Sequence, residues 1–384
     1  MCGIVGYVGD KQAAKFLLEG LNKLEYRGYD SAGIAVYNDE ADKIRVEKSV
    51  GRLAELEKKI DGNVPVGCIG IGHTRWATHG APSDLNSHPH TDCSGDFAVV
   101  HNGIIENYLV LKEQLIDKGH VFKSETDTEV LPHLLEEAYD GDFEAAVRKV
   151  LKQIEGSYSI VFMSKHDPDT LICTKQDNPL VIGLGEGENF IASDIPAIIA
   201  RTRRTYIIND GEIAVVKKDS VWITNRRGEP ITKKVFEVNW NAEAAEKGGY
   251  EHFMLKEIME QPRALKATIA PRIKNGKIVL DDFDEAFRAD FRYIDRIVIT
   301  ACGSAYHAGC VGRYMIESLC RVPVEVDVAS ELRYRHPIVD EHTLLIAVSQ
   351  SGETADTIAA IRECKAHGAR VLTIVNVVGS TVAK

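Results

Sequence analysis

The first residue able to do covalent chemistry is Cys2, which directly follows the initiator methionine and precedes Gly3. If Met1 is removed, Cys2 carries both a thiol and a free α-amine, whose reference pKa of about 7.7–8.0 lies close to neutrality. One residue then supplies a nucleophile and its general base. The alternative is a small apolar residue opening a buried strand, which is a common environment for cysteine. Position alone does not decide between the two interpretations.

Four polar motifs could surround such a nucleophile: His73–Gly80, which follows a predicted strand; Asn86–His90; His101–Gly103, where a predicted strand ends; and Ser124–Glu129. Asn102 and the Gly103 N–H are the donor types of an oxyanion hole, although Asn-Gly is also a common hairpin turn. Thr126 or Asp127 could equally cap a helix, and Arg75 could form an ordinary solvated ion pair. The turn, the helix cap and the ion pair each explain one motif. They do not explain why all four motifs occur in one chain together with Cys2.

A second polar cluster lies near the carboxyl end of the chain, where the loop Val348–Thr354 joins a predicted buried strand to a helix. Three hydroxyls, a glycine and free N–H groups at a helix N-terminus suit a phosphate, although an ordinary Ser/Thr cap is the alternative. Ala301–Ser304 follows an earlier strand in the same way, which favours a ligand crevice between the two loops. The chain has no G-x-G-x-x-G or P-loop motif, so we expect neither NAD nor ATP.

Hydrophobic periodicity predicts the elements that position these motifs. In the first part we expect strands at Cys2–Val8, Gly33–Tyr37, Val66–Gly72 and Phe97–His101, a helix capped by Asp10, and helices at Glu106–Lys118 and Thr128–Tyr139. From Ser157 to Thr224 nearly every element is a predicted strand. Runs of strands with few helices predict stacked antiparallel sheets.

The pattern changes after Asn225. We expect three parts: a first domain over 2–224, a linker and helical connector over 225–289, and a doubly wound parallel α/β domain over 290–384. The connector includes a helix at His252–Gln261 that Pro262 is expected to end. The parallel sheet stops early, with about three strands.

Composition limits the possible partners. The 384 residues carry a formal net charge of −11 and no dense basic run, so we expect no nucleic-acid partner. No apolar run reaches the roughly 18–20 residues of a membrane span, and the N-terminus lacks a secretory n-region. The eight cysteines form no C-x-x-C pair and have no zinc-ligand spacing. We therefore expect a reduced, soluble, cytoplasmic protein with no metal site and no cofactor.

The motifs together resemble a known family. Met-Cys-Gly-Ile-Val-Gly, the string Leu24–Gly33 (LEYRGYDSAG), His73–Gly80 (HTRWATHG), His-Asn-Gly and Ser-Glu-Thr-Asp-Thr-Glu are similar to class II (N-terminal nucleophile, Ntn) glutamine amidotransferases. The similarity is greatest to the glucosamine-6-phosphate synthase family and runs along the whole chain. It implies an αββα Ntn-hydrolase sandwich followed by a sugar isomerase (SIS) domain, and hydrolysis of L-glutamine to supply ammonia to fructose 6-phosphate.

The resemblance also implies roles for individual residues. Cys2 is expected to attack the glutamine amide and form a glutamyl thioester, Asn102 and Gly103 to hold the oxyanion, and Arg27 to lie near the nucleophile. The expected glutamine-binding residues are Arg75, Trp76, Thr78, His79, His88 and Asp127, with Arg75 on the α-carboxylate and Asp127 on the α-ammonium group. Trp76 resembles the gate of an internal ammonia channel. For Trp76 and His88, packing in the core is the alternative interpretation.

For the second domain, the resemblance implies that fructose 6-phosphate binds to Gly303, Ser304, Ser349, Gln350, Ser351 and Thr354. Ala305 stands where the family usually has a residue with a hydroxyl group. Its absence removes one hydrogen bond to the sugar or phosphate, worth roughly 0.5–1.5 kcal/mol of binding free energy. The family has a second SIS domain that isomerises the sugar, so we expect this chain to be a fragment of a longer synthase. We also expect a homodimer or a higher homo-oligomer.

Three other functions remain open at this point. Another class II amidotransferase is expected to show a phosphoribosyl-pyrophosphate motif or an ATP loop, and neither is visible. An N-terminal nucleophile acylase favours a bulky acyl substrate over a small zwitterion. The third is a glutaminase-only fragment, or a non-enzymatic module that binds sugar phosphate.

Overall fold

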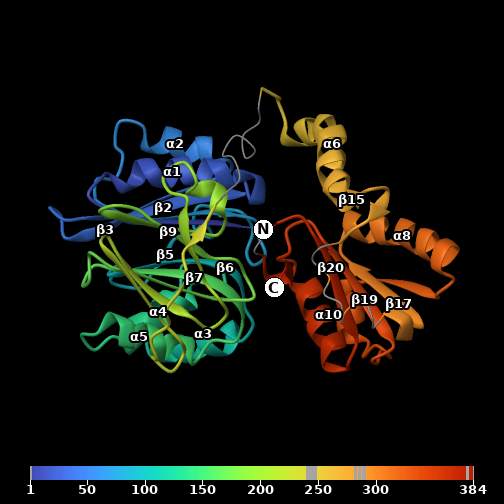
Figure 1. Ribbon diagram of the computed structural model, residues 1–384. Coiled ribbons are helices and arrows are strands. Elements are labelled where there is room, and N and C mark those ends of the chain that lie inside the picture. Colours follow the sequence, from blue (N-terminus) through green and yellow to red (C-terminus); the bar gives the residue numbers. More distant parts are fainter. Residues whose placement is uncertain are drawn as a thin grey trace. The chain divides into compact units, whose positions relative to one another are not determined.

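The computed structural model describes residues 2–238, 249–280, 283, 287, 291–377 and 380–383. The chain divides into two compact units, Met1–Ala245 and Glu246–Lys384 (Figure 1). Each unit is described by itself. No helix of the described residues combines the length and the apolarity that crossing a membrane requires.

The first unit contains two antiparallel sheets. The eight-stranded sheet has the order β14-β11-β9-β10-β1-β4-β2-β3 and the six-stranded sheet the order β13-β12-β8-β7-β6-β5. The strands are β1 (Gly3–Gly9), β2 (Ser31–Asn38), β3 (Lys43–Val50), β4 (Ile69–Arg75), β5 (His90–Thr91), β6 (Phe97–Ile105), β7 (Gly156–Ser164), β8 (Leu171–Gln176), β9 (Val181–Leu184), β10 (Glu188–Ala192), β11 (Arg204–Ile207), β12 (Ile213–Lys217), β13 (Ser220–Thr224) and β14 (Phe236–Glu237).

Helices cover the outer face of each sheet, which gives four layers (Figure 1). The eight-stranded sheet carries α1 (Ala13–Leu24) and α2 (Leu53–Ile60); the six-stranded sheet carries α3 (Tyr108–Asp117), α4 (Val130–Ala138) and α5 (Phe143–Leu151). A third apolar core fills the space between the sheets. This is the αββα sandwich expected from the sequence, so that fold prediction is confirmed.

Strand β1 shows why the sequence folds this way. Ile4 and Val8 face the core between the sheets, whereas Val5 and Tyr7 face α1, because successive side chains of a strand point to opposite faces. Both faces of the sheet are covered, so all seven residues are buried. The strand pairs with β10 on one side and β4 on the other, and this places Cys2 at the start of a central strand.

Several local expectations for this unit are wrong. Strand β6 runs on to Ile105, past the expected end at His101, so Asn102-Gly103 pairs with β7 inside the sheet and the alternative of a hairpin turn is excluded. Asp10 does not cap α1; it binds Lys218 through a 2.9 Å ion pair, and Gln12 occupies the cap position. The sequence analysis also missed β3, α2 and α5, which are short and rich in charged residues.

The second unit begins with α6 (Phe253–Ile269), followed by a short hairpin of β15 (Ile273–Lys274) and β16 (Lys277–Ile278). Helix α6 continues through Pro262, so the expected helix end at that residue is wrong. Proline removes one backbone donor from a helix, and here the 17-residue helix continues despite that loss. Parts of the expected linker, 239–248 among them, lie outside the described residues.

The rest of the second unit is a parallel sheet of four strands in the order β18-β17-β19-β20, one strand more than expected. Its elements are β17 (Arg296–Ala301), α8 (Ser304–Cys320), β18 (Val324–Val328), α9 (Ala329–Tyr334), β19 (Thr343–Ser349), α10 (Ala355–Ala366) and β20 (Arg370–Val375). Ile297 and Ile299 share one core cluster with Ile316 of α8, whereas Val298 packs with residues of α9 and α10 on the opposite face. The expected doubly wound arrangement is confirmed.

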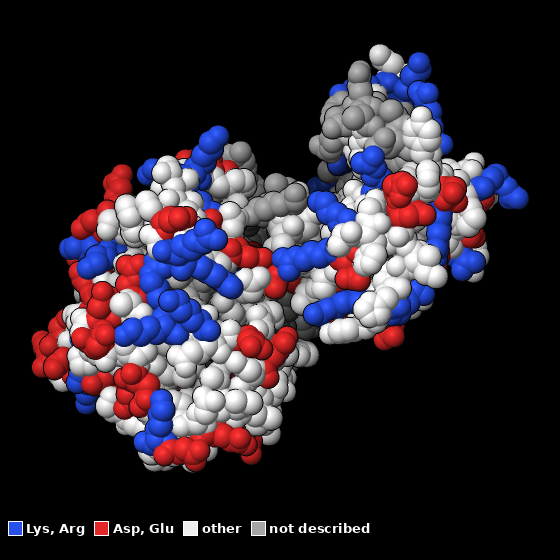
Figure 2. Space-filling view, turned by 90° about the horizontal axis from the view of Figure 1, so that it is seen from below, with Lys and Arg blue, Asp and Glu red and all other residues white. Residues whose placement is uncertain are grey.

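Charged side chains are mixed over the surface. On the face of the first unit seen in Figure 2, Lys and Arg side chains are interspersed with Asp and Glu.

Candidate active site

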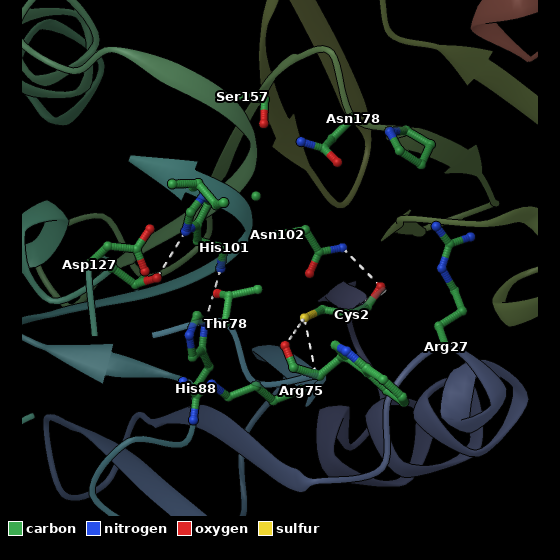
Figure 3. Close-up of a pocket in the computed structure, with 15 residues that line it drawn as sticks. Cys2, Arg27, Arg75, Thr78, His88, His101, Asn102, Asp127, Ser157 and Asn178 are labelled. Atoms are coloured by element: carbon green, nitrogen blue, oxygen red, sulfur yellow. Dashed lines mark hydrogen bonds between the residues drawn. The ribbon is translucent and has the colours of Figure 1, made fainter. Parts of the chain in front are cut away.

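A cavity of about 270 Å³ opens at the start of β1 in the first unit (Figure 3). Its lining residues are Cys2, Arg27, Arg75, Trp76, Thr78, His88, His101, Asn102, Gly103, Ile104, Asp127, Thr128, Ser157, Asn178 and Pro179. In Figure 3, Cys2 lies beside Asn102, and Asp127 and Arg27 lie on opposite sides of the thiol. The cavity thus brings together nine of the ten residues expected at a catalytic and glutamine-binding site.

The Cys2 thiol is held by the backbone of Trp76. The Trp76 N–H donates to Sγ at 3.2 Å, and Sγ lies 3.4 Å from the Trp76 carbonyl oxygen. Burial raises the pKa of the thiol, while the Trp76 hydrogen bond and the positive charges of Arg75 and Arg27 oppose that rise. Because the net direction is upward, the thiol needs a base to become a nucleophile.

The side-chain amide of Asn102 has a fixed orientation. His73 Nε2 lies 3.0 Å from Asn102 Oδ1 and 3.0 Å from the His101 carbonyl oxygen, so Nε2 carries the proton and donates. Burial lowers the pKa of His73 to about 3, which keeps the ring neutral. The Asn102 Nδ2 group is therefore turned toward Cys2, where it donates to the carbonyl oxygen at 3.1 Å. Its second N–H remains for a ligand in the cavity.

Gly103 follows in the same strand, with a φ of +125° that L side chains rarely adopt. A Cβ atom there would also lie 1.9 Å from the Ser157 carbonyl oxygen. Glycine is therefore required beside Asn102 for both reasons.

A layer of histidines supports the floor of the cavity. The rings of His73 and His88 stack with centroids 4.1 Å apart, and His88 Nδ1 accepts the His101 N–H at 3.3 Å. His101 Nδ1 lies 2.9 Å from Thr128 Oγ1, and His90 Nε2 lies 3.1 Å from Thr126 Oγ1. Burial lowers the pKa of all four histidines, so the layer is neutral.

Arg75 brings a positive charge to the cavity from the last position of β4. One guanidinium nitrogen, Nη2, donates to the carbonyl oxygens of His79 and Gly80. The other, Nη1, is buried and has no hydrogen-bond partner among the described residues. Burial lowers the pKa of Arg75, and nearby Cys2 and Asp127 oppose that shift. A buried donor of this kind favours an anionic ligand group.

Asp127 supplies the opposite charge. Its Oδ2 accepts the Ile105 N–H at 2.8 Å, and its Oδ1 lies 4.0 Å from His79 Nδ1. His79 contacts Thr78 through the same nitrogen, at 3.4 Å from Oγ1. His79 does not itself line the cavity: its carbonyl oxygen holds Arg75, and its ring faces Asp127.

The string Tyr26–Asp30 packs against the strand end that carries Arg75. Arg27 is buried and forms a 2.8 Å ion pair with Asp194, which also accepts the Tyr26 hydroxyl at 2.7 Å. Burial opposes the charge of Arg27, but Asp194 and Tyr26 outweigh it and raise the pKa of the guanidinium group. A Cβ atom on Gly28 would lie 2.8–2.9 Å from the Arg75-Trp76 peptide, so the close approach needs a glycine.

Trp76 lies at the mouth of the cavity. Its side chain is 46% exposed and packs edge-on against Tyr29, with ring centroids 5.5 Å apart. This exposure does not fit the interpretation of Trp76 as a buried core residue. His88, by contrast, both lines the cavity and packs in the histidine layer.

The sequence analysis did not assign functional roles to several residues here: His73, His101, Ile104, Thr128, Ser157, Asn178 and Pro179. His73 and His101 stand inside the motifs, and their neighbours in those motifs were the only available signal. Ser157 and Asn178 reach the cavity through the pairing of β7 with β6 and through the loop after β8. Neither position has a motif that could have predicted it.

The residues expected to bind a sugar phosphate lie at the carboxyl ends of two neighbouring parallel strands. Gly303 and Ser304 follow β17, while Ser349 ends β19 and the loop runs to Thr354, before α10. The chain passes from β17 to β18 on one side and continues with β19 on the other, so the two loops flank the point where strand order reverses.

The hydrogen bonds of this loop differ in part from the expectation. The Gly352 N–H donates to Ser349 Oγ at 2.9 Å and the Glu353 N–H donates to Ser351 Oγ at 3.2 Å, so these two N–H groups are not free. Both hydroxyls act as acceptors and keep their own hydrogens for donation. Gly352 has a φ of +67°, and a Cβ atom there would lie 2.1 Å from Ser380 Oγ.

Comparison with known families agrees with this arrangement. Residues 73–200 match the family model of a glutamine amidotransferase domain, and residues 290–384 match that of a SIS domain. The fold of the chain is also similar to that of the glutamine phosphoribosylpyrophosphate amidotransferase from B. subtilis. The TM-score is 0.53 at 18% identity, over 98% of this chain and 81% of the other. At this identity the similarity concerns the fold alone.

Curated relatives match the whole chain. It is 59% identical over 385 residues to the glutamine–fructose-6-phosphate aminotransferase (isomerizing) of Caldanaerobacter subterraneus subsp. tengcongensis, and 54% identical over 384 residues to that of Clostridium tetani. Both alignments cover 100% of this chain and 63% of the relative. The chain thus spans less than two thirds of the length of these relatives, and the resemblance expected from its motifs is confirmed.

Proposed function

We propose that this chain, which joins a glutamine amidotransferase domain to a SIS domain, hydrolyses L-glutamine at Cys2 to supply ammonia for the amination of fructose 6-phosphate. The product is glucosamine 6-phosphate. The observation that carries the proposal is the convergence in one cavity of the Cys2 thiol, the oriented amide of Asn102, the free donor of Arg75 and the carboxylate of Asp127.

The cavity suits glutamine because its charges match a free amino acid. Arg75 Nη1 binds the α-carboxylate, and Asp127 Oδ1 accepts the α-ammonium group. A cavity of about 270 Å³ with both charges fits a small zwitterion better than a bulky acyl group. Thr78, His79, His88 and Trp76 complete or order the walls of the pocket.

The reaction follows from the groups around Cys2. With Met1 removed, the α-amine of Cys2 takes the thiol proton, and the thiolate attacks the side-chain carbonyl carbon of glutamine. Asn102 Nδ2 and the Gly103 N–H stabilise the oxyanion of the tetrahedral intermediate. On collapse, the α-ammonium group of Cys2 gives its proton to the amide nitrogen of glutamine, the C–N bond breaks, ammonia leaves, and a thioester remains. Water then hydrolyses the thioester to glutamate and restores the thiol.

The raised pKa of Cys2 supports the role of the α-amine, because the buried thiol does not ionise without a base. Among the described residues, His73, His88 and His101 are neutral, and each uses one ring nitrogen in a hydrogen bond to a protein group and not to Cys2. We assign Arg27 a positioning role: its ion pair with Asp194 fixes the segment that packs beside Cys2.

The second unit is proposed to bind the sugar phosphate. Ser349, Gln350, Ser351 and Thr354 come from one loop and Gly303 and Ser304 from the other, at the strand-order reversal where such ligands bind. Helices α8 and α10 both begin at these loops. The N–H groups at a helix N-terminus favour binding of a phosphate.

Two measurements test the proposal. Glutamate release from glutamine is followed together with the mass of the chain, which reports whether Met1 has been removed. Calorimetric titration with fructose 6-phosphate tests the second unit. Processed protein that releases no glutamate contradicts the glutaminase assignment, and an absence of heat with fructose 6-phosphate contradicts the sugar site alone.

A further inference from the structure

A second group of chemically reactive side chains lies outside the cavity. Cys93, His120, His133 and Glu136 each offer one ligand atom, and the four atoms lie within 4.8 Å of one another. We propose that these four residues bind a Zn²⁺ ion that fixes the loop carrying Asp127.

The four residues come from three separate segments. Cys93 lies in the loop between β5 and β6, and His120 follows α3. His133 and Glu136 are three residues apart on α4 and therefore share one face of that helix. Helices α3 and α4 lie together on the outer face of the six-stranded sheet (Figure 1).

The distances fit four ligands around one ion. Cys93 Sγ lies 3.8 Å from His120 Nδ1 and 3.7 Å from His133 Nδ1. Glu136 Oε2 lies 3.1 Å from His120 Nδ1 and 3.6 Å from His133 Nδ1. Tetrahedral Zn²⁺, with bonds of about 2.3 Å to sulfur and about 2.0–2.2 Å to nitrogen and oxygen, puts such pairs about 3.3–3.6 Å apart. These four distances differ from those values by only a few tenths of an ångström, and the other two ligand pairs lie within 4.8 Å.

The far side of each imidazole ring supports the same interpretation. His120 Nε2 lies 3.1 Å from Glu137 Oε1, so it carries a proton and donates. The Nδ1 atom of the same ring faces Cys93 Sγ and Glu136 Oε2, on the side where the ion would lie. His133 Nε2 is buried, has no hydrogen-bond partner among the described residues and lies 3.9 Å from Glu129 Oε1. A carboxylate behind each ligating histidine is typical of zinc sites.

The backbone also orients the sulfur and the carboxylate. The backbone N–H of Val121 donates to Cys93 Sγ at 3.4 Å. The backbone N–H of Cys93 itself donates to Glu136 Oε2 at 3.3 Å, which orients that carboxylate. Binding replaces the S–H bond with a Zn–S bond and releases one proton to solvent. A set of one thiolate, two imidazoles and one carboxylate favours Zn²⁺ over Mg²⁺ or Ca²⁺, which prefer oxygen ligands alone.

The position of the site suggests what the ion does. His120 and His133 bracket the segment that contains Asp127, so an ion bound to both would hold the two ends of that segment together. Glu129, behind His133, also accepts the N–H groups of Lys123 at 2.7 Å and Ser124 at 2.6 Å. The ion is structural, because all four positions are taken by protein side chains and no position is left for substrate.

The test is the metal content of the full chain, expressed with zinc and freed of any histidine tag. We expect about one zinc per chain. Removal by a strong chelator should lower Tm by about 5–10 °C, and Zn²⁺, unlike Mg²⁺, should restore it. Protein loaded with Co²⁺ in place of zinc should show the visible absorption of a tetrahedral site and a thiolate charge-transfer band.

The matched variants are Cys93→Ser and Cys68→Ser. Cys93 is exposed, so its replacement is compatible with folding, and Cys68 is a thiol outside the cluster. Cys93→Ser should lose most of its zinc and the charge-transfer band, whereas Cys68→Ser should keep both. Equal zinc in the two variants, or wild-type protein without zinc, without the cobalt band and with an unchanged Tm after chelation, would overturn the proposal. Neither result depends on glutaminase activity.

Discussion

His73 fixes Asn102. The proton on His73 Nε2 points at Asn102 Oδ1 from 3.0 Å, so the amide nitrogen, and not the amide oxygen, faces the carbonyl group of Cys2. His73 is not among the residues that line the cavity; it contacts three that do, namely Asn102, His101 through its carbonyl oxygen, and His88 through ring stacking. The side chain proposed as an oxyanion donor is thereby oriented by a neutral, buried histidine of the other sheet.

This contact predicts a non-additive pair. Asn102→Ala should lower kcat for glutamate release by about 10²–10³-fold with little change in KM, because one oxyanion donor is lost. His73→Leu should lower kcat in the same direction, because the amide is then free to turn its oxygen toward the substrate. If His73 acts through Asn102, the double variant should be no slower than Asn102→Ala alone. Multiplied effects would show that His73 has an independent role.

Cys2 and Cys68 provide the test of the nucleophile. Cys2→Ala should abolish glutamate release, because no other thiol lines the cavity. Cys68→Ala should keep the activity, because Cys68 is a half-buried thiol outside that lining. Equal losses in the two variants would contradict a special role for Cys2. Circular dichroism of both variants controls for folding.

Arg75→Lys should raise KM for glutamine by about 10–100-fold while kcat changes less. A lysine keeps the charge, but it cannot donate to the carbonyl oxygens of His79 and Gly80 and bind a carboxylate at the same time. The variant therefore loses a charge-assisted hydrogen bond to the substrate, worth about 1.5–3 kcal/mol. Steady-state kinetics over a wide range of glutamine concentration separates the two parameters. The exposed Arg52→Lys is the matched control, and a similar rise in KM there would remove the argument.

The histidine layer predicts a loss of stability in acid. Burial lowers the pKa of His73 to about 3 and also lowers the pKa values of His88, His90 and His101, whereas an unfolded histidine has a pKa of about 6.5. Between these values the unfolded chain binds protons that the folded chain excludes. The free energy of unfolding should therefore fall as pH decreases below about 6.5, by up to about 1.4 kcal/mol per pH unit for each histidine.

Denaturant unfolding of the chain at several pH values measures this slope. His88→Asn keeps an acceptor for the His101 N–H but removes one titrating ring, so its slope should be shallower. His252, whose side chain is 72% exposed, gives the control His252→Gln with an unchanged slope. An identical slope in all three proteins would place the acid sensitivity elsewhere.

Apolar runs predicted the stacked antiparallel sheets and the parallel sheet because such runs are local signals, whereas the αββα sandwich was implied by the resemblance of the motifs. Prediction from the sequence failed where pairing between distant strands decided the outcome. Asn102-Gly103 has the composition of a turn, yet pairing of β6 with β7 holds it inside a strand. Pro262 is a local signal for a helix end, and α6 continues past it.

The candidate site shows the same division. Cys2, Arg75, Asn102 and Asp127 could be predicted because each stands in a compact motif. Ser157 and Asn178 could not, because only the folded sheets bring them to the cavity. Cysteine spacing alone predicted no metal ligands. It cannot detect a group such as that of Cys93, His120, His133 and Glu136, in which one cysteine meets side chains from two other segments.

The central position of β1 has a dynamic consequence. Edge strands such as β13 and β3 can open locally at a small cost in free energy. Opening of β1 instead breaks the hydrogen bonds to β10 and β4 and exposes side chains of two apolar cores to water. The amides of Val5 and Tyr7 should therefore exchange with deuterium only as fast as the whole first unit unfolds. Cys2, the proposed nucleophile, directly precedes this strand, so mild denaturant that opens the edge strands should leave the position of its thiol unchanged.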